Sequence, residues 1–147
     1  EVPVSFDVNH RPALWDPATA TEVLHELVPF TDLLIASEDE LELVATGSEP
    51  DAVADLLREG VTAVVVKRGA RGASAYTAEG RVDVRAQRVP VVDVIGAGDA
   101  LCAGLLSGLL DDLPLADALE RGVAVASRCV ASAGDWEGLP TRSDLSL

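Results

Sequence analysis

The feature that most constrains the fold is residues 61–66, an apolar and largely β-branched run interrupted by a single threonine. A strand with one face in water alternates apolar and polar residues, whereas a strand covered on both faces is apolar almost throughout. Residues 2–8 and 32–36 are further stretches with strand character. These three segments predict a mostly parallel, twisted sheet with helices on both of its faces.

Helical patterns alternate with the predicted strands. Asp16 followed by Pro17 marks one helix start, because Asp caps free backbone N–H groups and Pro is tolerated at the first helical position. We expect helices over residues 16–28, 38–45, 49–60, 99–110 and 114–131, a hairpin of residues 73–77 and 81–86, a strand over residues 89–94 and a short helix after residue 141. This order predicts a single three-layer α/β domain.

The charge balance argues against two classes of partner. The chain has 25 acidic and 11 basic residues, which gives a net charge of −14. Such a surface repels phosphate backbones and anionic lipids, so we expect no nucleic-acid and no membrane partner, although solubility alone also explains the acidity. The two cysteines, Cys102 and Cys129, have no close Cys or His partner in the sequence, which argues against a disulfide scaffold or a zinc site. The two histidines are too few for a His-based metal cluster. This usage favours a reducing, cytoplasmic location.

The sharpest chemical motif is Gly96-Ala97-Gly98-Asp99, placed between a predicted strand and a predicted helix. The first N–H groups of a helix lack internal partners, and with the helix dipole they form an anion site. Glycines let a phosphate approach the backbone, and the Asp99 carboxylate can accept a proton from an attacking hydroxyl. A simple turn followed by a helix cap is the alternative interpretation of these four residues. The small residues Ala103 and Gly104 predict close packing of the helix on the sheet.

Two further segments carry charge near predicted strand ends. Lys67, Arg68 and Arg71 form the densest basic cluster, and Gly69 and Gly72 lie within it. Such a loop can hold nucleotide phosphates, and a solvated turn is the alternative.

The segment Ser37-Glu38-Asp39-Glu40 follows another predicted strand and has the pattern of an ordinary helix start. Residues 7–15 also follow a strand, where α/β sheets place ligands. Asn9 and Arg11 lie in this segment, and Arg11 can bind a carboxylate bidentately. A surface loop whose Trp15 packs into the core is the alternative.

Residues 93–106 resemble the C-terminal signature of the ribokinase-like, PfkB-type carbohydrate kinases. The resemblance implies that Gly96, Ala97 and Gly98 form an anion hole for the transferred phosphoryl group and that Asp99 is the base. It also implies a nucleotide role for Asp93, which opens the signature. The chain departs from the family pattern in having Val and Ile at positions 94 and 95, where members often carry hydroxyl residues.

Other segments are similar to the same family in the expected order. Residues 67–72 resemble its K-x-G-x-x-G loop, which implies that Lys67, Gly69 and Gly72 contact the nucleotide. Residues 37–40 resemble its N-x-x-E motif with Ser in place of Asn, which implies that Glu40 helps to place Mg²⁺. Residues 7–15 and 134–141 look like the corresponding segments of 2-keto-3-deoxygluconate kinases, which implies that Asn9 and Arg11 bind a sugar acid.

The resemblance implies an ATP- and Mg²⁺-dependent phosphotransferase that acts on a hydroxyl of a small sugar acid. The chain contains no Met and begins near a strand. We therefore expect residues 1–147 to be the nucleotide-binding C-terminal part of such a kinase, without the N-terminal half and lid, and to be poorly active alone. Dimerisation is possible in this scheme. The alternatives are a non-catalytic binding module and a kinase for another sugar or a nucleoside.

Overall fold

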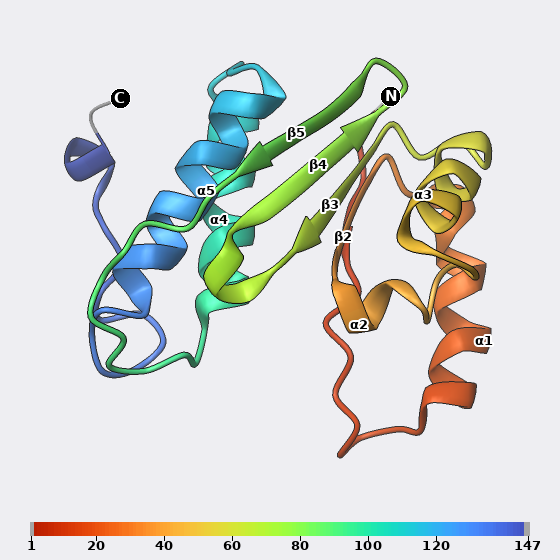
Figure 1. Ribbon diagram of the computed structural model, residues 1–147, viewed down its shortest axis with the longest axis horizontal. Helices are drawn as coiled ribbons and strands as arrows, with labels where there is room; N and C mark the ends of the chain where they lie inside the picture. Colours follow the sequence, from red (N-terminus) through yellow and green to blue (C-terminus); the bar gives the residue numbers. More distant parts are fainter. Residues whose placement is uncertain (1, 146–147) are drawn as a thin grey trace. The chain divides into compact units, whose positions relative to one another are not determined.

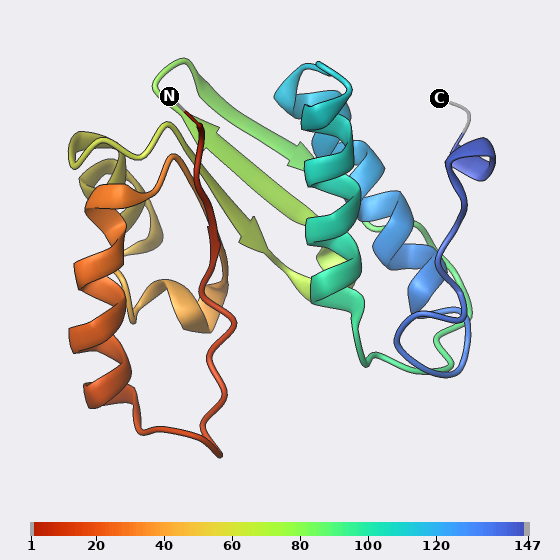
Figure 2. The same ribbon diagram turned by 180° about the vertical axis from the view of Figure 1, so that it is seen from behind.

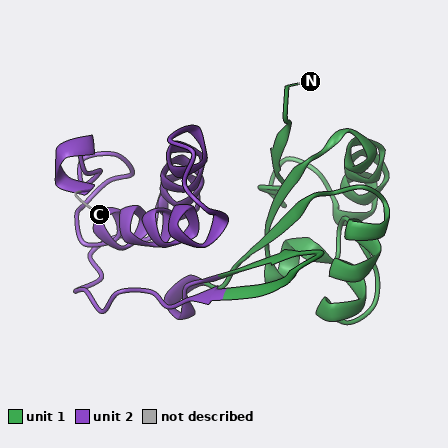
Figure 3. Cartoon of the chain, turned by 90° about the horizontal axis from the view of Figure 1, so that it is seen from above, with its two compact units in different colours: residues 1–68, 74–82 green, residues 69–73, 83–147 purple. Residues whose placement is uncertain are grey.

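A computed structural model describes residues 2–145 of the chain. The chain divides into two compact units, shown in Figure 3. Unit 1 consists of residues 1–68 and 74–82, and unit 2 consists of residues 69–73 and 83–147.

One five-stranded sheet has its strands in chain order, β1-β2-β3-β4-β5. The strands are β1 (Ser5–Asp7), β2 (Leu33–Ser37), β3 (Ala63–Lys67), β4 (Ala73–Thr77) and β5 (Gly80–Val84). The first three strands are parallel, with Leu33 opposite both Ser5 and Ala63. The arrows in Figure 1 show that β4 runs against its neighbours. The expected α/β class with a mostly parallel sheet is confirmed.

Unit 1 packs its helices on the buried strands β2 and β3, as Figures 1 and 2 show from opposite sides. The helices are α1 (Pro17–Leu27), α2 (Glu38–Leu41) and α3 (Glu49–Arg58). Their core contains Leu24, Leu34, Leu56 and Val64, each at most 3% exposed. Asp16 caps α1 as expected, because its carboxylate accepts the N–H groups of the next turn.

Helix α2 is shorter than the predicted helix over residues 38–45. It ends at Leu41, and the backbone N–H of Leu43 donates to Glu40 while that of Val44 donates to Leu41. Bonds between residues three apart are typical of the tighter turns that terminate helices. This turn leaves Val44 buried in the unit 1 core.

Unit 2 is built on two helices, α4 (Ala97–Leu110) and α5 (Leu115–Cys129), which lie side by side in Figures 1 and 2. A Cβ atom added to Gly104 would lie 2.8 Å from the Cα atom of Gly122, and one added to Gly122 would lie 2.8 Å from the Leu101 carbonyl oxygen. Gly104 therefore allows α4 to approach α5. The predicted role of Gly104 in packing the helix on the sheet is wrong, because its close neighbours belong to α5. The predicted short helix is present as a 3-10 turn, Arg142–Leu145.

The predicted strand over residues 89–94 is wrong. These residues have no strand structure, and the side chains of Val91, Val92 and Val94 are at least 60% exposed. The N–H groups of Val92 and Asp93 both donate to the carbonyl of Val130, at the end of α5. A β-branched run favours a strand only where a neighbouring strand can pair with it, and these N–H groups bind a helix end instead.

No helix within residues 2–145 combines the length and apolar character that crossing a bilayer requires.

Candidate functional site

The carboxyl ends of the parallel strands gather three charged side chains in unit 1. Asp7 ends β1 and Lys67 ends β3, while Glu40 lies in the helix that follows β2. The Nζ atom of Lys67 lies 2.6 Å from Oδ1 of Asp7 and 3.6 Å from Oε2 of Glu40. Each of these side chains is at most 20% exposed. Parallel pairing brings distant segments to one edge of the sheet, where ligands of α/β proteins bind.

Glu40 has further partners at both carboxylate oxygens. Its Oε2 atom accepts the N–H of Ser37 at 2.7 Å, and its Oε1 atom accepts the N–H of His10 at 2.9 Å. The Ser37 hydroxyl accepts the Glu40 N–H in return, which completes a capping box at the start of α2. Burial opposes ionisation of Glu40, but the hydrogen bond from Ser37 and the charge of Lys67 outweigh it and lower the pKa.

The segment after β1 forms a loop with hydrogen bonds of its own. Asn9 has a left-handed backbone with φ of +43°. The His10 ring nitrogen Nε2 lies 3.2 Å from the Trp15 carbonyl oxygen, and the N–H of Leu14 donates to the carbonyl of Arg11. Trp15 packs partly into the core, which agrees with the alternative of a surface loop anchored by Trp15. The side chains of Asn9 and Arg11 are exposed.

Arg68 does not belong to the phosphate-binding cluster that the sequence predicts. Its guanidinium pairs with Glu38 at 2.7 Å and with Glu49 at 2.5 Å, and it also donates to Ser74 and Tyr76. The Arg68 guanidinium lowers the pKa of the Glu49 carboxyl. This partly buried network joins the start of α3 to the central strands, so the charge of Arg68 is already neutralised.

The two glycines of the basic loop have different environments. Gly72 has φ of +102°, and an added Cβ atom would lie 1.9 Å from the carbonyl oxygen of Val84. Only a residue without a side chain therefore fits at this position, where the backbone packs against the end of β5 and the residues that follow it. Gly69 has φ of +54°, and an added Cβ atom would meet open space. Of the two, Gly69 leaves its backbone accessible to a ligand.

The predicted anion turn lies at the start of α4 in unit 2. Gly96 is the N-terminal cap residue with φ of +74°, and within residues 2–145 no side chain caps the helix. The helix begins at Ala97, two residues before the predicted start, so the exposed Asp99 lies in its first turn. Uncapped N–H groups and the positive end of the helix dipole favour an anion here.

A second segment, around Gly134, supports this turn through a contact that the sequence does not predict. The Asp93 carboxylate accepts the N–H of Ile95 at 3.0 Å and that of Gly134 at 3.3 Å, and these bonds lower the pKa of Asp93. The buried Cys129 thiol lies 3.6 Å from the Ile95 carbonyl oxygen. A Cβ atom on Gly96 would collide with Asp135. In the sequence, the glycines of residues 134–138 indicate a tight loop. Its contact with the anion turn becomes visible only in the fold.

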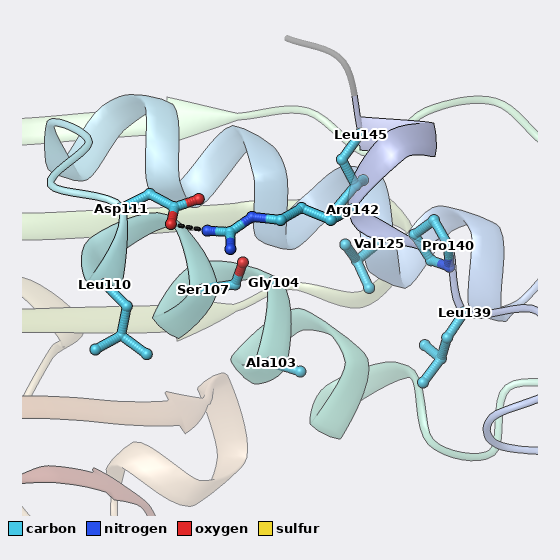
Figure 4. A pocket seen from close by; sticks show the side chains of 10 residues that line it. All are labelled: Ala103, Gly104, Ser107, Leu110, Asp111, Val125, Leu139, Pro140, Arg142 and Leu145. Atoms are coloured by element: carbon cyan, nitrogen blue, oxygen red, sulfur yellow. Dashed lines mark hydrogen bonds and ion pairs between the residues drawn. The ribbon is translucent and has the colours of Figure 1, made fainter.

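A pocket of about 460 Å³ lies elsewhere in unit 2, between α4, the middle of α5 and the C-terminal segment (Figure 4). Its floor includes Ala103, Gly104 and Ser107, and Arg142 pairs with Asp111 at its edge. None of the predicted site residues lines it. Arg142 is the one cation among the described residues that line the pocket, and its charge is paired with that of Asp111.

The predicted residues thus fall into two groups. Unit 1 holds Lys67 and Glu40 with the loop that carries Asn9 and Arg11. Unit 2 holds the glycines of the basic loop, Asp93 and the turn at the start of α4.

Comparison with known proteins assigns this arrangement to one family. The model of the pfkB family carbohydrate kinases matches residues 2–142. The chain is 38% identical over 146 residues to a 2-dehydro-3-deoxygluconokinase of Bacillus subtilis and 31% identical over 150 residues to a 5-dehydro-2-deoxygluconokinase of Bacillus licheniformis. A structure described as a ribokinase II of E. coli with ATP and Mg²⁺ superposes with a TM-score of 0.86 at 34% identity.

These matches cover nearly all of this chain but less of each relative. The alignments include 97% and 99% of this chain and 45% and 46% of the two Bacillus proteins. The structural match includes 94% of this chain and 45% of the E. coli protein. The chain therefore spans just under half the length of the relatives that it matches.

Proposed function

The chain belongs to the pfkB family of carbohydrate kinases, and from that premise we propose that it carries the ATP site and the catalytic base of a sugar-acid kinase. Residues 1–147 would form the nucleotide-binding C-terminal part of that enzyme. The observation that carries the proposal is the uncapped start of α4, with Asp99 in its first turn. A helix start of this kind offers N–H donors to an anion and places a carboxylate beside them.

The proposed reaction transfers the γ-phosphoryl group of ATP to a hydroxyl of the substrate. The hydroxyl oxygen forms a bond to the γ-phosphorus, the bond between that phosphorus and the bridging oxygen breaks, and ADP leaves. Asp99 accepts the hydroxyl proton, as a general base. The backbone N–H groups of Gly96, Ala97 and Gly98 stabilise the charge that develops on the transferred group.

Lys67 and Gly69 are the residues of the basic loop that we assign to the nucleotide. Lys67 is a cation at the carboxyl end of β3, and Gly69 has open space beside its backbone. The ammonium group of Lys67 would move from Asp7 and Glu40 toward a phosphate oxygen. We assign Asp93 and Gly72 to the support of these loops, because both contact neighbouring backbone.

Mg²⁺ fits the donor chemistry on this chain. The described residues contain no cluster of three ligating side chains, and Mg²⁺ commonly binds one or two carboxylates together with water and substrate phosphates. The ionised, oxygen-donating Glu40 supplies such a carboxylate. When bound, the ion neutralises charge on the phosphates.

The substrate we propose is a small keto-deoxy sugar acid such as 2-keto-3-deoxygluconate. Two observations support it. The exposed Arg11 forms no ion pair within the described residues and can hold a carboxylate through two parallel hydrogen bonds. Both curated relatives are named as kinases of dehydro-deoxygluconates. Asn9 lies beside Arg11 and would contact a substrate hydroxyl.

The test is Asp99→Asn in the full protein that contains this chain. The amide preserves the shape of the side chain but cannot accept the proton. We expect kcat to fall by about two orders of magnitude or more, the usual contribution of a general base, while ATP affinity changes little. Asp117→Asn is the matched control, because Asp117 lies in the first turn of α5. Unchanged turnover of Asp99→Asn would refute the proposed base.

A further inference from the structure

One carboxylate in unit 1 joins two segments to which we assign different ligands. Oε1 of Glu40 accepts the backbone N–H of His10 at 2.9 Å. His10 lies in the loop that carries Arg11. Oε2 of Glu40 faces Lys67 at 3.6 Å and accepts the N–H of Ser37 at 2.7 Å. The side chain is 14% exposed. Glu40 is thus an internal hydrogen-bond acceptor as well as the metal ligand that we propose.

The loop of residues 9–15 has few other attachments. The last ladder bond before it runs from the Val8 N–H to the Ile35 carbonyl. Within residues 2–145, the loop has one hydrogen bond to another element, from the His10 N–H to Glu40. Its other two bonds are internal: one joins the His10 ring to the Trp15 carbonyl, and the other joins the Leu14 N–H to the Arg11 carbonyl.

The loop also begins with an unfavourable backbone conformation. Asn9 has φ of +43°, a region that residues other than glycine seldom adopt, although Asn tolerates it better than most. Such a conformation persists when neighbouring contacts hold it. The next residue donates the bond to Glu40, so this contact fixes the chain direction between Asn9 and Arg11.

We propose that Glu40 is a positioning residue for the substrate loop, and that through His10 it sets how firmly Arg11 holds the carboxylate of the sugar acid. The substrate part of this inference rests on the proposed function, whereas the attachment of the loop does not. This role differs from that of a metal ligand, because the hydrogen bond between His10 and Glu40 is present before nucleotide or Mg²⁺ binds. It therefore predicts an effect on the ligand-free protein and on sugar-acid affinity without MgATP.

The first experiment measures amide hydrogen exchange in the ligand-free full protein. In Glu40→Ala we expect the His10 amide to exchange about tenfold faster or more, because a hydrogen bond to a charged group is lost. Glu40→Gln keeps one acceptor oxygen and is expected to retain more protection than Glu40→Ala. Unchanged exchange at His10 in both variants would refute the attachment.

Two control variants separate this contact from the stability of α2. Ser37→Ala removes the other half of the capping box but leaves the bond between His10 and Glu40, so His10 is expected to stay protected. Asp39→Ala removes a neighbouring exposed acidic residue of the same helix. Equal loss of protection at His10 in Ser37→Ala and Glu40→Ala would mean that only the helix matters and would overturn the proposal.

The second experiment measures binding of 2-keto-3-deoxygluconate by calorimetry, without nucleotide and without Mg²⁺. We expect Glu40→Ala to weaken binding about tenfold and the two control variants to bind like the wild type. If Glu40→Ala binds the sugar acid normally and loses activity only with MgATP, Glu40 acts through the metal and the positioning role is refuted. If the wild type itself does not bind the sugar acid, the proposed substrate fails, while hydrogen exchange still decides the attachment.

Discussion

Lys67 and Arg68 are adjacent in the sequence, yet their side chains have different chemical environments. Lys67 contacts two carboxylates at the carboxyl edge of the parallel strands. Arg68 pairs with Glu38 and Glu49 beside the central strands. Adjacent basic residues in a sequence therefore need not bind the same phosphate group, because successive side chains at the end of a strand point to opposite sides of the sheet.

At the residue scale we predict that Arg11 selects acidic substrates. Arg11→Ala should raise the KM for 2-keto-3-deoxygluconate about tenfold or more, because a charge-assisted pair is lost. It should barely change the KM for a neutral sugar of similar size. Steady-state kinetics with both substrates measure the difference, and Arg58→Ala, at an exposed arginine of α3, is the control. Equal changes with both substrates would leave Arg11 only a structural role.

At the element scale, the packing of α4 against α5 depends on small residues. An added Cβ atom on Gly104 would lie 2.8 Å from the Gly122 Cα atom, and one on Gly108 would lie 2.7 Å from the Ala118 Cα atom. The neighbouring atoms belong to the backbone, so they cannot rotate away as a flexible side chain can. Since α4 begins at the anion turn, this close packing also fixes the helix that carries Asp99.

We predict that Gly104→Val lowers the free energy of unfolding by roughly 1–3 kcal/mol, the usual cost of overpacking. Urea denaturation followed by circular dichroism measures it. Ala103→Val is the matched control, because Ala103 is exposed on the same helix and the new residue has the same helix propensity. Helix propensity alone would destabilise Ala103→Val but not Gly104→Val, because glycine is a poorer helix former than valine. A Gly104→Val variant as stable as the wild type would therefore refute the packing role.

At the scale of the whole molecule, stability depends on carboxylates that the fold keeps ionised. The pKa of Glu40 is lowered against the effect of burial, and that of Glu49 is lowered mainly by Arg68. A carboxyl whose pKa is lower in the folded state stabilises the fold above its unfolded pKa. This contribution is lost as the pH falls through the folded pKa.

We therefore predict that the free energy of unfolding falls from neutral pH toward pH 3, where the net charge also changes from strongly negative to positive. Urea titrations at a series of pH values give the profile. Carbon-detected NMR titration of Glu40 and Glu49 gives the folded pKa values, which should lie below the usual glutamate range. Stability that stays constant or rises on acidification would contradict the assignment of these ion pairs.

The sequence by itself determined the local structure and the family. The β-branched run of residues 61–66 predicts the buried strand β3, and Asp16 with Pro17 predicts the start of α1. The motif from Gly96 to Asp99 predicts a turn before a helix. These features are readable because each depends on neighbours in the chain: periodicity, capping and backbone freedom are local properties.

The tertiary structure decided which of those residues are available for chemistry. It paired Arg68 with distant carboxylates and used Gly72 for packing against Val84. It left residues 89–94 without a strand partner and placed the loop containing Gly134 against the anion turn. It also attached His10 to Glu40 across 30 residues of sequence. Ion pairs, ladder partners and close approaches depend on contacts between segments far apart in the chain, so no local pattern specifies them.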